Sequence, residues 1–121
     1  MRISAKSESD RERSKERNAD KDWSIKIRER DNWVCSICGS RFGIIAHHII
    51  PRENKVYKYD LMNGIALCCK CHKFSRRISA HNAPFAFLLW LAKYKPLQYQ
   101  LAEERVIESL IGDIELRNDA A

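Results

Sequence analysis

The chain has 121 residues, a hydrophobic content of 45% and a formal net charge of +6 at pH 7. This length is enough for one folded domain with a modest core, and it excludes two. The longest apolar run, residues 83–92, is far short of the roughly 20 residues that a membrane-spanning helix needs, so we expect no membrane partner. The first residues lack the apolar stretch of a secretory signal. We therefore expect a cytoplasmic, reducing location, where paired cysteines favour metal over disulfides.

The positive charge is concentrated in the middle of the chain. Residues 32–81 hold eight Lys/Arg and two Asp/Glu, whereas residues 1–31 hold ten and eight, and residues 82–121 hold four and six. The middle segment also holds all five cysteines and all four histidines. A localised basic region is typical of proteins that bind nucleic acid, although ordinary solubility charge explains it equally well when charge alone is considered.

The N-terminal part of the chain divides into two segments. Residues 1–21 are highly charged with few apolar side chains, which predicts a flexible arm, either disordered or a solvated helix. Trp23 and Ile27 then lie at helical spacing, with Asp20 or Asp22 available as an N-cap. We expect a short helix that packs these two apolar side chains on the domain and ends near position 30.

The middle of the chain predicts an antiparallel hairpin. A β-branched run at residues 44–50, ended by a proline, predicts the first strand. Residues 52–62 are polar and predict a long connecting loop, and Asn63 and Gly64 predict a turn. Residues 65–68 predict the second strand.

Helices are predicted for the rest of the chain. A helix over residues 71–80 would present an apolar face for packing and a polar face, the latter with His72 and Arg76. Asn82 is the expected cap of the next helix, which would be buried over residues 85–91. One or two further helices should follow Pro96.

Two Cys-x-x-Cys pairs, Cys35/Cys38 and Cys68/Cys71, flank the hairpin. Four thiolates suit a closed tetrahedral zinc site, and such an ion stabilises a fold whose own core is small. The alternative is a set of buried structural thiols without metal. Cys69 falls outside the pairs and is expected to be a packed free thiol.

The residues between the pairs carry a second pattern. Adjacent His47 and His48 are followed by Asn63 and then by His72, which comes directly after the last paired cysteine. Together with the cysteine pairs, this pattern resembles HNH homing and phage-type endonucleases over about residues 22–80. The resemblance implies an α+β fold: a small ββα-metal (His-Me finger) core held by a four-cysteine zinc site, with an N-terminal helix and C-terminal helices. The expected divisions are 1–21 (arm), 22–81 (nuclease core) and 82–121 (helical extension).

The resemblance also implies a role for each residue of the pattern. His48 would be the general base that takes a proton from the attacking water, a task suited to an imidazole near neutral pH. His47 and His72 would hold a catalytic divalent ion, Mg²⁺ or Mn²⁺, with Zn²⁺ or Ni²⁺ as alternatives. Asn63 would support the site by bonding backbone across the loop. The main alternative is that His47 and His48 exchange roles, because neighbours on a strand point to opposite faces.

These expectations lead to a functional hypothesis. The chain would be a DNA endonuclease that hydrolyses phosphodiester bonds, by nicking or by double-strand cleavage. The alternatives are a zinc-stabilised DNA- or RNA-binding module that does not cut, and a disulfide-linked secreted protein. A homodimer is left open.

His81 is interpreted as a helix-boundary residue. The candidate phosphate contacts, each of which is also explained as a solvated basic side chain, are Arg52, Lys70, Lys73, Arg76 and Arg77.

Overall fold

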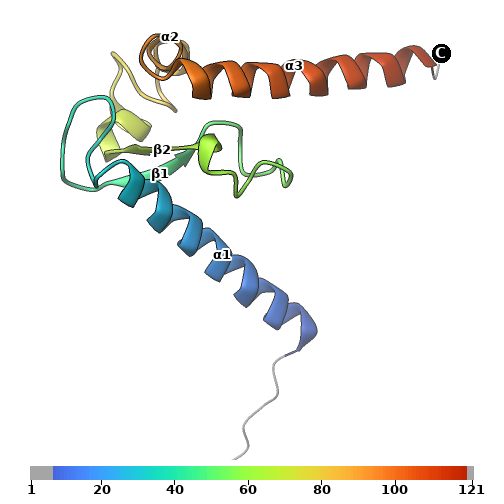
Figure 1. The fold of residues 1–121 in the computed structure, drawn as a ribbon, viewed down its shortest axis with the longest axis horizontal. Helices are drawn as coiled ribbons and strands as arrows, with labels where there is room; N and C mark the ends of the chain where they lie inside the picture. The colour runs from blue at the N-terminus through green and yellow to red at the C-terminus, as the bar shows by residue number, and fades with distance from the viewer. Residues whose placement is uncertain (1–6, 120–121) are drawn as a thin grey trace, which may run out of the picture.

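The computed structural model describes residues 7–119, and these form a two-stranded sheet with flanking helices, the α+β class expected from the sequence (Figure 1). The first six and last two residues, which belong to the expected arm and extension, lie outside the described residues. In chain order the elements are α1 (Glu8–Arg30), β1 (Ile45–His48), the 3₁₀ turn η1 (Leu61–Asn63), β2 (Gly64–Leu67), the π-helical turn η2 (Lys70–Phe74), α2 (Pro84–Tyr94) and α3 (Pro96–Asp119).

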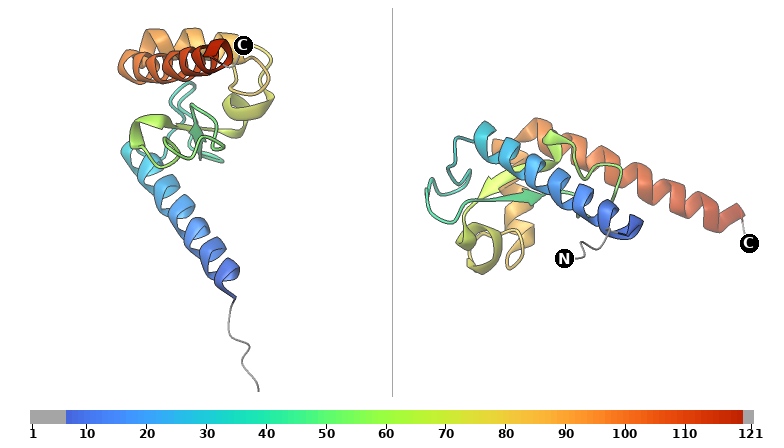
Figure 2. Two further views of the ribbon diagram at one scale, coloured as in Figure 1. Left: turned by 90° about the vertical axis from the view of Figure 1, so that its right-hand side faces the viewer. Right: turned by 90° about the horizontal axis from the view of Figure 1, so that it is seen from below.

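The two strands pair antiparallel, as predicted, and each face of this small sheet is covered by a helix. Residues directly opposite each other in such a pair share a face. Ile65 and Leu67 face the core that contains Phe87 and Leu91 of α2, whereas α1 packs on the other face at Gly64. Figure 2 shows the sheet between α1 on one side and the α2–α3 pair on the other.

Helix α1 begins much earlier than predicted. It starts at Glu8, with Ser7 as its N-cap, rather than at Asp20 or Asp22. The solvated-helix alternative therefore describes this segment, because a charged sequence without Pro or Gly can remain helical when side-chain pairs such as Arg13–Asp10 support it. Trp23 and Ile27 are its buried residues, as expected.

The C-terminal end of α1 is fastened to β2 by polar contacts. Arg30 donates to the carbonyl oxygens of Leu61 and Gly64, each at 2.7 Å, and the Asp31 carboxylate accepts from the backbone N–H of Ala66 at 2.9 Å. Gly64 is required here, because a Cβ at this position would lie 2.5 Å from Ile27 and 2.6 Å from Trp23. The helix therefore lies directly against the end of the hairpin.

The predicted helix over residues 71–80 is wrong beyond its first turn. Helical structure ends at Phe74, whose side chain is 68% exposed instead of packed. Ser79 explains the change: its hydroxyl donates to the Ser75 carbonyl and accepts from the backbone N–H groups of Asn82 and Ala83. Such local side-chain bonds compete with a continuing helix.

Helices α2 and α3 also differ from prediction in detail. Ala83, not Asn82, precedes the first residue of α2, and the Asn82 side chain donates instead to the Phe74 carbonyl. Phe87 and Leu91 are buried as expected, but the predicted burial of the whole helix is wrong, because Phe85, Leu88 and Leu89 are exposed. The alternative of a single further helix is realised in α3, which continues through Gly112.

Helix α3 is attached to the sheet end of the molecule through its first half. Gln98 donates to the carbonyls of Met62 and Gly64, and Arg105 forms an ion pair with Asp60. The second half of α3 projects from the body (Figure 1). Within residues 7–119, no helix has the length and apolar character needed to span a membrane.

Candidate functional site

The four paired cysteines converge as predicted. The sulfur atoms of Cys35, Cys38, Cys68 and Cys71 all lie within 4.8 Å of one another, and the Cys38 and Cys68 sulfurs are 3.5 Å apart. Four sulfurs around a tetrahedral zinc, each at about 2.3 Å from it, would be about 3.8 Å apart. The cluster therefore fits a structural zinc ion, which would join the loop after α1 to the end of β2 and to η2.

The electrostatics of the cysteine cluster agree with a cation-binding role. Burial raises the pKa of the Cys35 thiol, but backbone hydrogen bonds from Cys38 and Cys68 outweigh it and lower the pKa to about 7. Burial and the neighbouring Cys35 raise the pKa of Cys71. The Cys35 thiolate is thus favoured, while the raised pKa values of Cys38 and Cys71 oppose ionisation of those two thiols without a cation. The fifth cysteine, Cys69, is exposed rather than packed, contrary to the prediction.

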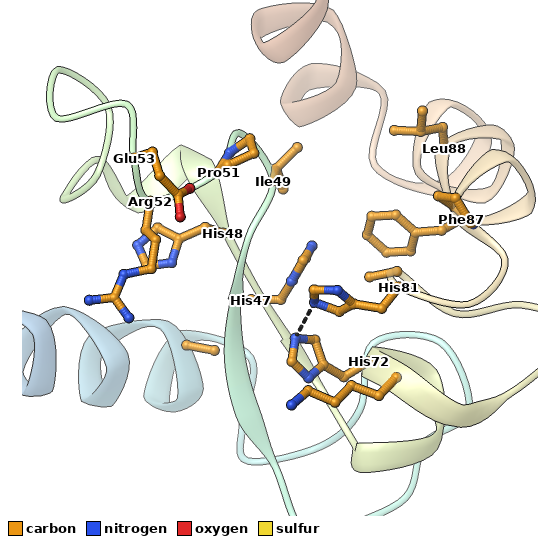
Figure 3. Close-up of a pocket in the computed structure, with 14 residues that line it drawn as sticks. His47, His48, Ile49, Pro51, Arg52, Glu53, His72, His81, Phe87 and Leu88 are labelled. Atoms are coloured by element: carbon orange, nitrogen blue, oxygen red, sulfur yellow. Dashed lines mark hydrogen bonds between the residues drawn. The ribbon is translucent and has the colours of Figure 1, made fainter.

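A second cluster is formed by three imidazoles. His47, His72 and His81 each offer a ring nitrogen within 4.8 Å of the others. Figure 3 shows the three rings converging from β1, from η2 and from the loop before α2. The Nε2 atoms of His72 and His81 are 3.0 Å apart. Two nitrogens bound to one ion at about 2.0–2.1 Å are separated by about this distance, so the cluster fits a metal site.

Two of the clustered histidines, His47 and His72, are neutral at physiological pH. Burial, reinforced by the nearby His72 and His81, lowers the pKa of His47 to about 3. Burial and His81 lower the pKa of His72 to about 4. Neutral imidazoles keep the lone pairs that a metal ion requires.

His81 is a site residue that the sequence interpretation missed. It was assigned to a helix boundary, yet its ring lies 4.4 Å from that of His72 and 5.5 Å from that of His47, measured between centroids. Backbone hydrogen bonds from Ala80 to Cys71 and from His81 to His72, each 2.9 Å, fold the loop back onto η2. No helical or strand spacing links residues 72 and 81. The only signal available from the sequence was that His81 lies in the middle segment, residues 32–81, which holds all four histidines.

His48 lies apart from this cluster, on the other face of β1. His47 pairs with Ile65 and His48 with Gly64, so the two histidines point toward α2 and α1, respectively. Figure 3 shows them on opposite sides of the strand. The His48 ring stacks on Trp23 with centroids 3.9 Å apart and ring planes at 9°. Both histidines nevertheless line the same open cleft.

The orientation of His48 is fixed by the loop after β1. Its Nε2 lies 3.0 Å from the Lys58 carbonyl oxygen. Because a carbonyl can only accept, Nε2 carries the proton and Nδ1 is left with a free lone pair. Burial lowers the pKa of His48, with Arg52 and Lys58 adding to the effect and the Lys58 carbonyl opposing it. The ring is therefore neutral and basic at Nδ1.

Lys58 is itself held in place by α1. Its side chain is 2% exposed, and its ammonium group lies 2.8 Å from Glu16 and 3.0 Å from Asp20. These carboxylates raise the pKa of Lys58 despite its desolvation. Tyr59 also donates to Asp20, at 2.8 Å. The segment expected to be an arm thus supports the loop that holds His48.

Asn63 holds the end of β1. The side chain is buried, its Oδ1 accepts from the backbone N–H of Ile50 at 2.8 Å, and its Nδ2 donates to the carbonyls of Ile50 and Tyr57 at 3.0 and 3.3 Å. These are the cross-loop backbone bonds expected of a supporting residue. Its importance for activity stays a prediction.

The cleft beside the histidines has a volume of about 610 Å³. Of the five candidate phosphate contacts, Arg52 and Lys73 line it, and Phe87 and Leu88 of α2 form its apolar wall. Arg77 lines a separate groove. Arg76 is exposed beyond the end of η2, so it does not share a helical face with His72 as predicted.

Comparison with protein families gives a match that covers most of this site. The model of the family described as HNH endonuclease matches residues 35–75. No curated protein and no solved structure matches the chain. The matched segment contains both cysteine pairs, both strands, Asn63 and His72, whereas His81 lies outside it. Residues 35–75 therefore match the HNH endonuclease family, and this segment holds the hairpin, the four clustered cysteines and two of the three clustered histidines, His47 and His72.

Proposed function

We propose that the protein is a metal-dependent DNA endonuclease that hydrolyses a phosphodiester bond by attack of water. The observation that carries this proposal is the convergence of His47, His72 and His81 in a cleft that also contains a separately held fourth histidine and basic side chains. A cysteine cluster alone would serve a binding module equally well. Three converging imidazoles in an open cleft are the additional feature that a non-cutting module does not need.

His48 is the proposed general base. Its protonated Nε2 is engaged by the Lys58 carbonyl, Trp23 supports one face of the ring, and Nδ1 remains able to accept a proton from water. Glu16 and Asp20 act indirectly by holding Lys58. We assign metal binding to His47 and proton transfer to His48, because only His47 shares the cluster with His72.

The three clustered histidines would hold a Mg²⁺ or Mn²⁺ ion, or a softer ion such as Zn²⁺ or Ni²⁺, which imidazole ligands favour. Such an ion supplies charge stabilisation for the pentavalent transition state and for the departing oxygen. Arg52 and Lys73, which both line the cleft, would position the phosphate. The cysteine cluster would hold zinc purely for structure, because a four-thiolate site leaves no open position.

The proposal is tested by nicking of supercoiled plasmid. Wild-type protein should convert the supercoiled plasmid to the open circular form in the presence of Mg²⁺ or Mn²⁺. Addition of EDTA should stop this conversion. His48→Ala should slow the reaction at least about a hundredfold, the lower end of the range for removing a general base. Phe85→Ala, an exposed position outside the cleft, is the matched control and should nick at the wild-type rate.

Two results would overturn parts of the proposal. Absence of metal-dependent nicking across several divalent ions and DNA forms would leave the zinc-stabilised binding module as the function. Wild-type nicking by His48→Ala would remove the base assignment while the nuclease stands. A single site of this kind cuts one strand, so a double-strand break would need two copies or two successive events.

A further inference from the structure

A second groove lies between the first cysteine pair and α2. Its volume is about 740 Å³, and it shares no lining residue with the histidine cleft. Ile37 forms part of one wall, and Trp90 and Tyr94 of α2 form part of another. Arg77 and Lys95 supply its charged side chains, and none of the described residues that line it is acidic. The groove therefore combines aromatic surface with positive charge.

The aromatic side chains are placed for stacking. Trp90 and Tyr94 lie one helical turn apart, with centroids 5.8 Å apart and ring planes at 35°. The Tyr94 side chain is 59% exposed, and the Lys93 ammonium lies 5.4 Å from the centre of its ring. Exposed aromatic rings next to cations are the common means by which proteins hold unpaired bases, since every base offers a π-face.

The groove is connected to the proposed active site by a row of rings. The His47 ring is 5.6 Å from Phe87, and Phe87 stacks on Trp90 at 6.2 Å and 20°. The two ring-to-ring distances together correspond to about four nucleotides at most, because neighbouring nucleotides in one strand are about 3.4 Å apart. The His47 and Trp90 rings are therefore separated by only a few nucleotide lengths, with the buried Phe87 between them.

We propose that this groove binds an unpaired base of the substrate, stacked on Tyr94 and Trp90, while Arg77 and Lys95 contact the flanking phosphates. The inference rests on the proposed function, since it concerns the same nucleic acid a few nucleotides from the cut. In duplex DNA the faces of the bases are covered by their neighbours, so an aromatic groove of this kind has no surface to stack on. The groove would direct the enzyme to DNA that is single-stranded or locally unpaired near the cleaved bond.

Binding is measured without cleavage, in full-length His48→Ala protein checked for wild-type zinc content. The probe is a fluorescein-labelled 15-nucleotide oligo(dT), with a blunt duplex of the same length for comparison, and the readout is fluorescence anisotropy. Tyr94→Ala should weaken binding of the single strand about tenfold, which lies in the lower half of the range for losing one stacked base. Trp90→Phe, which keeps an aromatic ring in a partly buried position, should stay within about threefold. Binding of the duplex should change less than twofold.

Charge is tested separately from stacking. Arg77→Gln should reduce the slope of log affinity against log salt concentration by about 0.7, the value for one phosphate contact on a single strand. Arg11→Gln, an exposed position on the first half of α1, is the matched charge control and should leave the slope unchanged. Phe85→Ala is the matched aromatic control on α2 and should leave affinity for oligo(dT) unchanged.

The proposal fails if Tyr94→Ala and Arg77→Gln bind oligo(dT) as the parent does. It also fails if Phe85→Ala loses as much affinity as Tyr94→Ala, or if single strand and duplex lose affinity equally. These outcomes are independent of the nicking assay. If the protein never nicks plasmid but the variants lose affinity for oligo(dT) as expected, the base-binding groove stands and the proposed nuclease function fails. If the protein nicks plasmid but the variants bind oligo(dT) as the parent does, the nuclease function stands and the base-binding groove fails.

Discussion

His81 illustrates how a single residue changes the chemistry available to the site. With His47 and His72 alone, an ion would have two protein ligands; the third imidazole, 3.0 Å from His72 between Nε2 atoms, closes one side of the cluster. His81 lies outside the segment that matches the HNH family model. Its contribution is therefore the most direct test of whether the cluster binds metal as a unit.

Replacing His81 by Ala should weaken binding of Ni²⁺ about ten- to hundredfold, because one of three nitrogen ligands is removed. The measurement is isothermal titration calorimetry on protein already saturated with zinc at its cysteines. His48→Ala is the matched control, since its ring lies on the opposite face of β1 and its Nε2 is engaged by Lys58. Equal Ni²⁺ affinity in wild type and His81→Ala would show that the ion, if bound, does not use this ligand.

The same residues show how far a sequence can predict a site. His47, His72 and the two cysteine pairs were identifiable because each belongs to a short motif. His81 was not, because its position depends on a loop whose path is set by Ser79 and by backbone pairing with η2. Contacts of this kind have no period in the sequence.

At the scale of elements, the cysteine cluster replaces much of the packing that a larger core would provide. Cys35 and Cys38 come from the loop after α1, Cys68 from the end of β2 and Cys71 from η2. The core around them is small and includes three of the four cysteines. Without an ion, crowded thiols in this core would leave the loop without a strong attachment to the sheet.

Zinc content provides the test at this scale. Wild-type protein should hold one tightly bound zinc per chain, and Cys38→Ser or Cys71→Ser should lose it together with cooperative thermal unfolding. Cys69→Ser is the matched control, because Cys69 is adjacent to Cys68 yet lies outside the cluster, and it should keep full zinc. Metal analysis by mass spectrometry after gel filtration gives the stoichiometry. Full zinc in both Cys38→Ser and Cys71→Ser would refute the four-thiolate site.

Element prediction succeeded where a regular pattern extended over several residues and failed at the ends of elements. Both strands and the loop between them followed from short apolar runs and the polar stretch that separates them, and the burial of Trp23 and Ile27 followed from helical spacing. The start of α1 could not be predicted in this way, because the first half of the helix is held by charge pairs and by Lys58, which lies far along the chain. Tertiary ion pairs of this kind cannot be read from local propensity.

At the scale of the whole molecule, ion pairs attach both long helices to the loop between the strands. Lys58 in that loop is held by Glu16 and Asp20 of α1, and Asp60 near its end is held by Arg105 of α3. The neighbouring Tyr57 ring also lies 4.2 Å from the Arg105 guanidinium. The loop that orients His48 is thus stabilised from two helices that are distant in the sequence.

This arrangement predicts how stability depends on pH. Burial raises the pKa of Asp20 and of Asp60, but Lys58 and Tyr59 in the first case, and the Met62 backbone and Arg105 in the second, outweigh it and lower both values. A carboxylate with a lowered pKa in the folded state stabilises it fully above the unfolded value of about 3.9 and loses that contribution as the pH falls through the folded value. These contacts should therefore weaken below about pH 4.

Asp60→Asn should lower the free energy of unfolding by about 0.5–1 kcal/mol at pH 6, the range for a partly exposed ion pair, and by less at pH 3. The measurement is urea unfolding at several pH values, followed by circular dichroism. Since acid also protonates the cysteines, the informative quantity is the difference between variant and parent at each pH. Asp113→Asn, on the projecting part of α3 and without an ion pair to any described residue, is the control. A difference that stays constant from pH 6 to pH 3 would contradict the proposed link between Asp60 ionisation and the docking of α3.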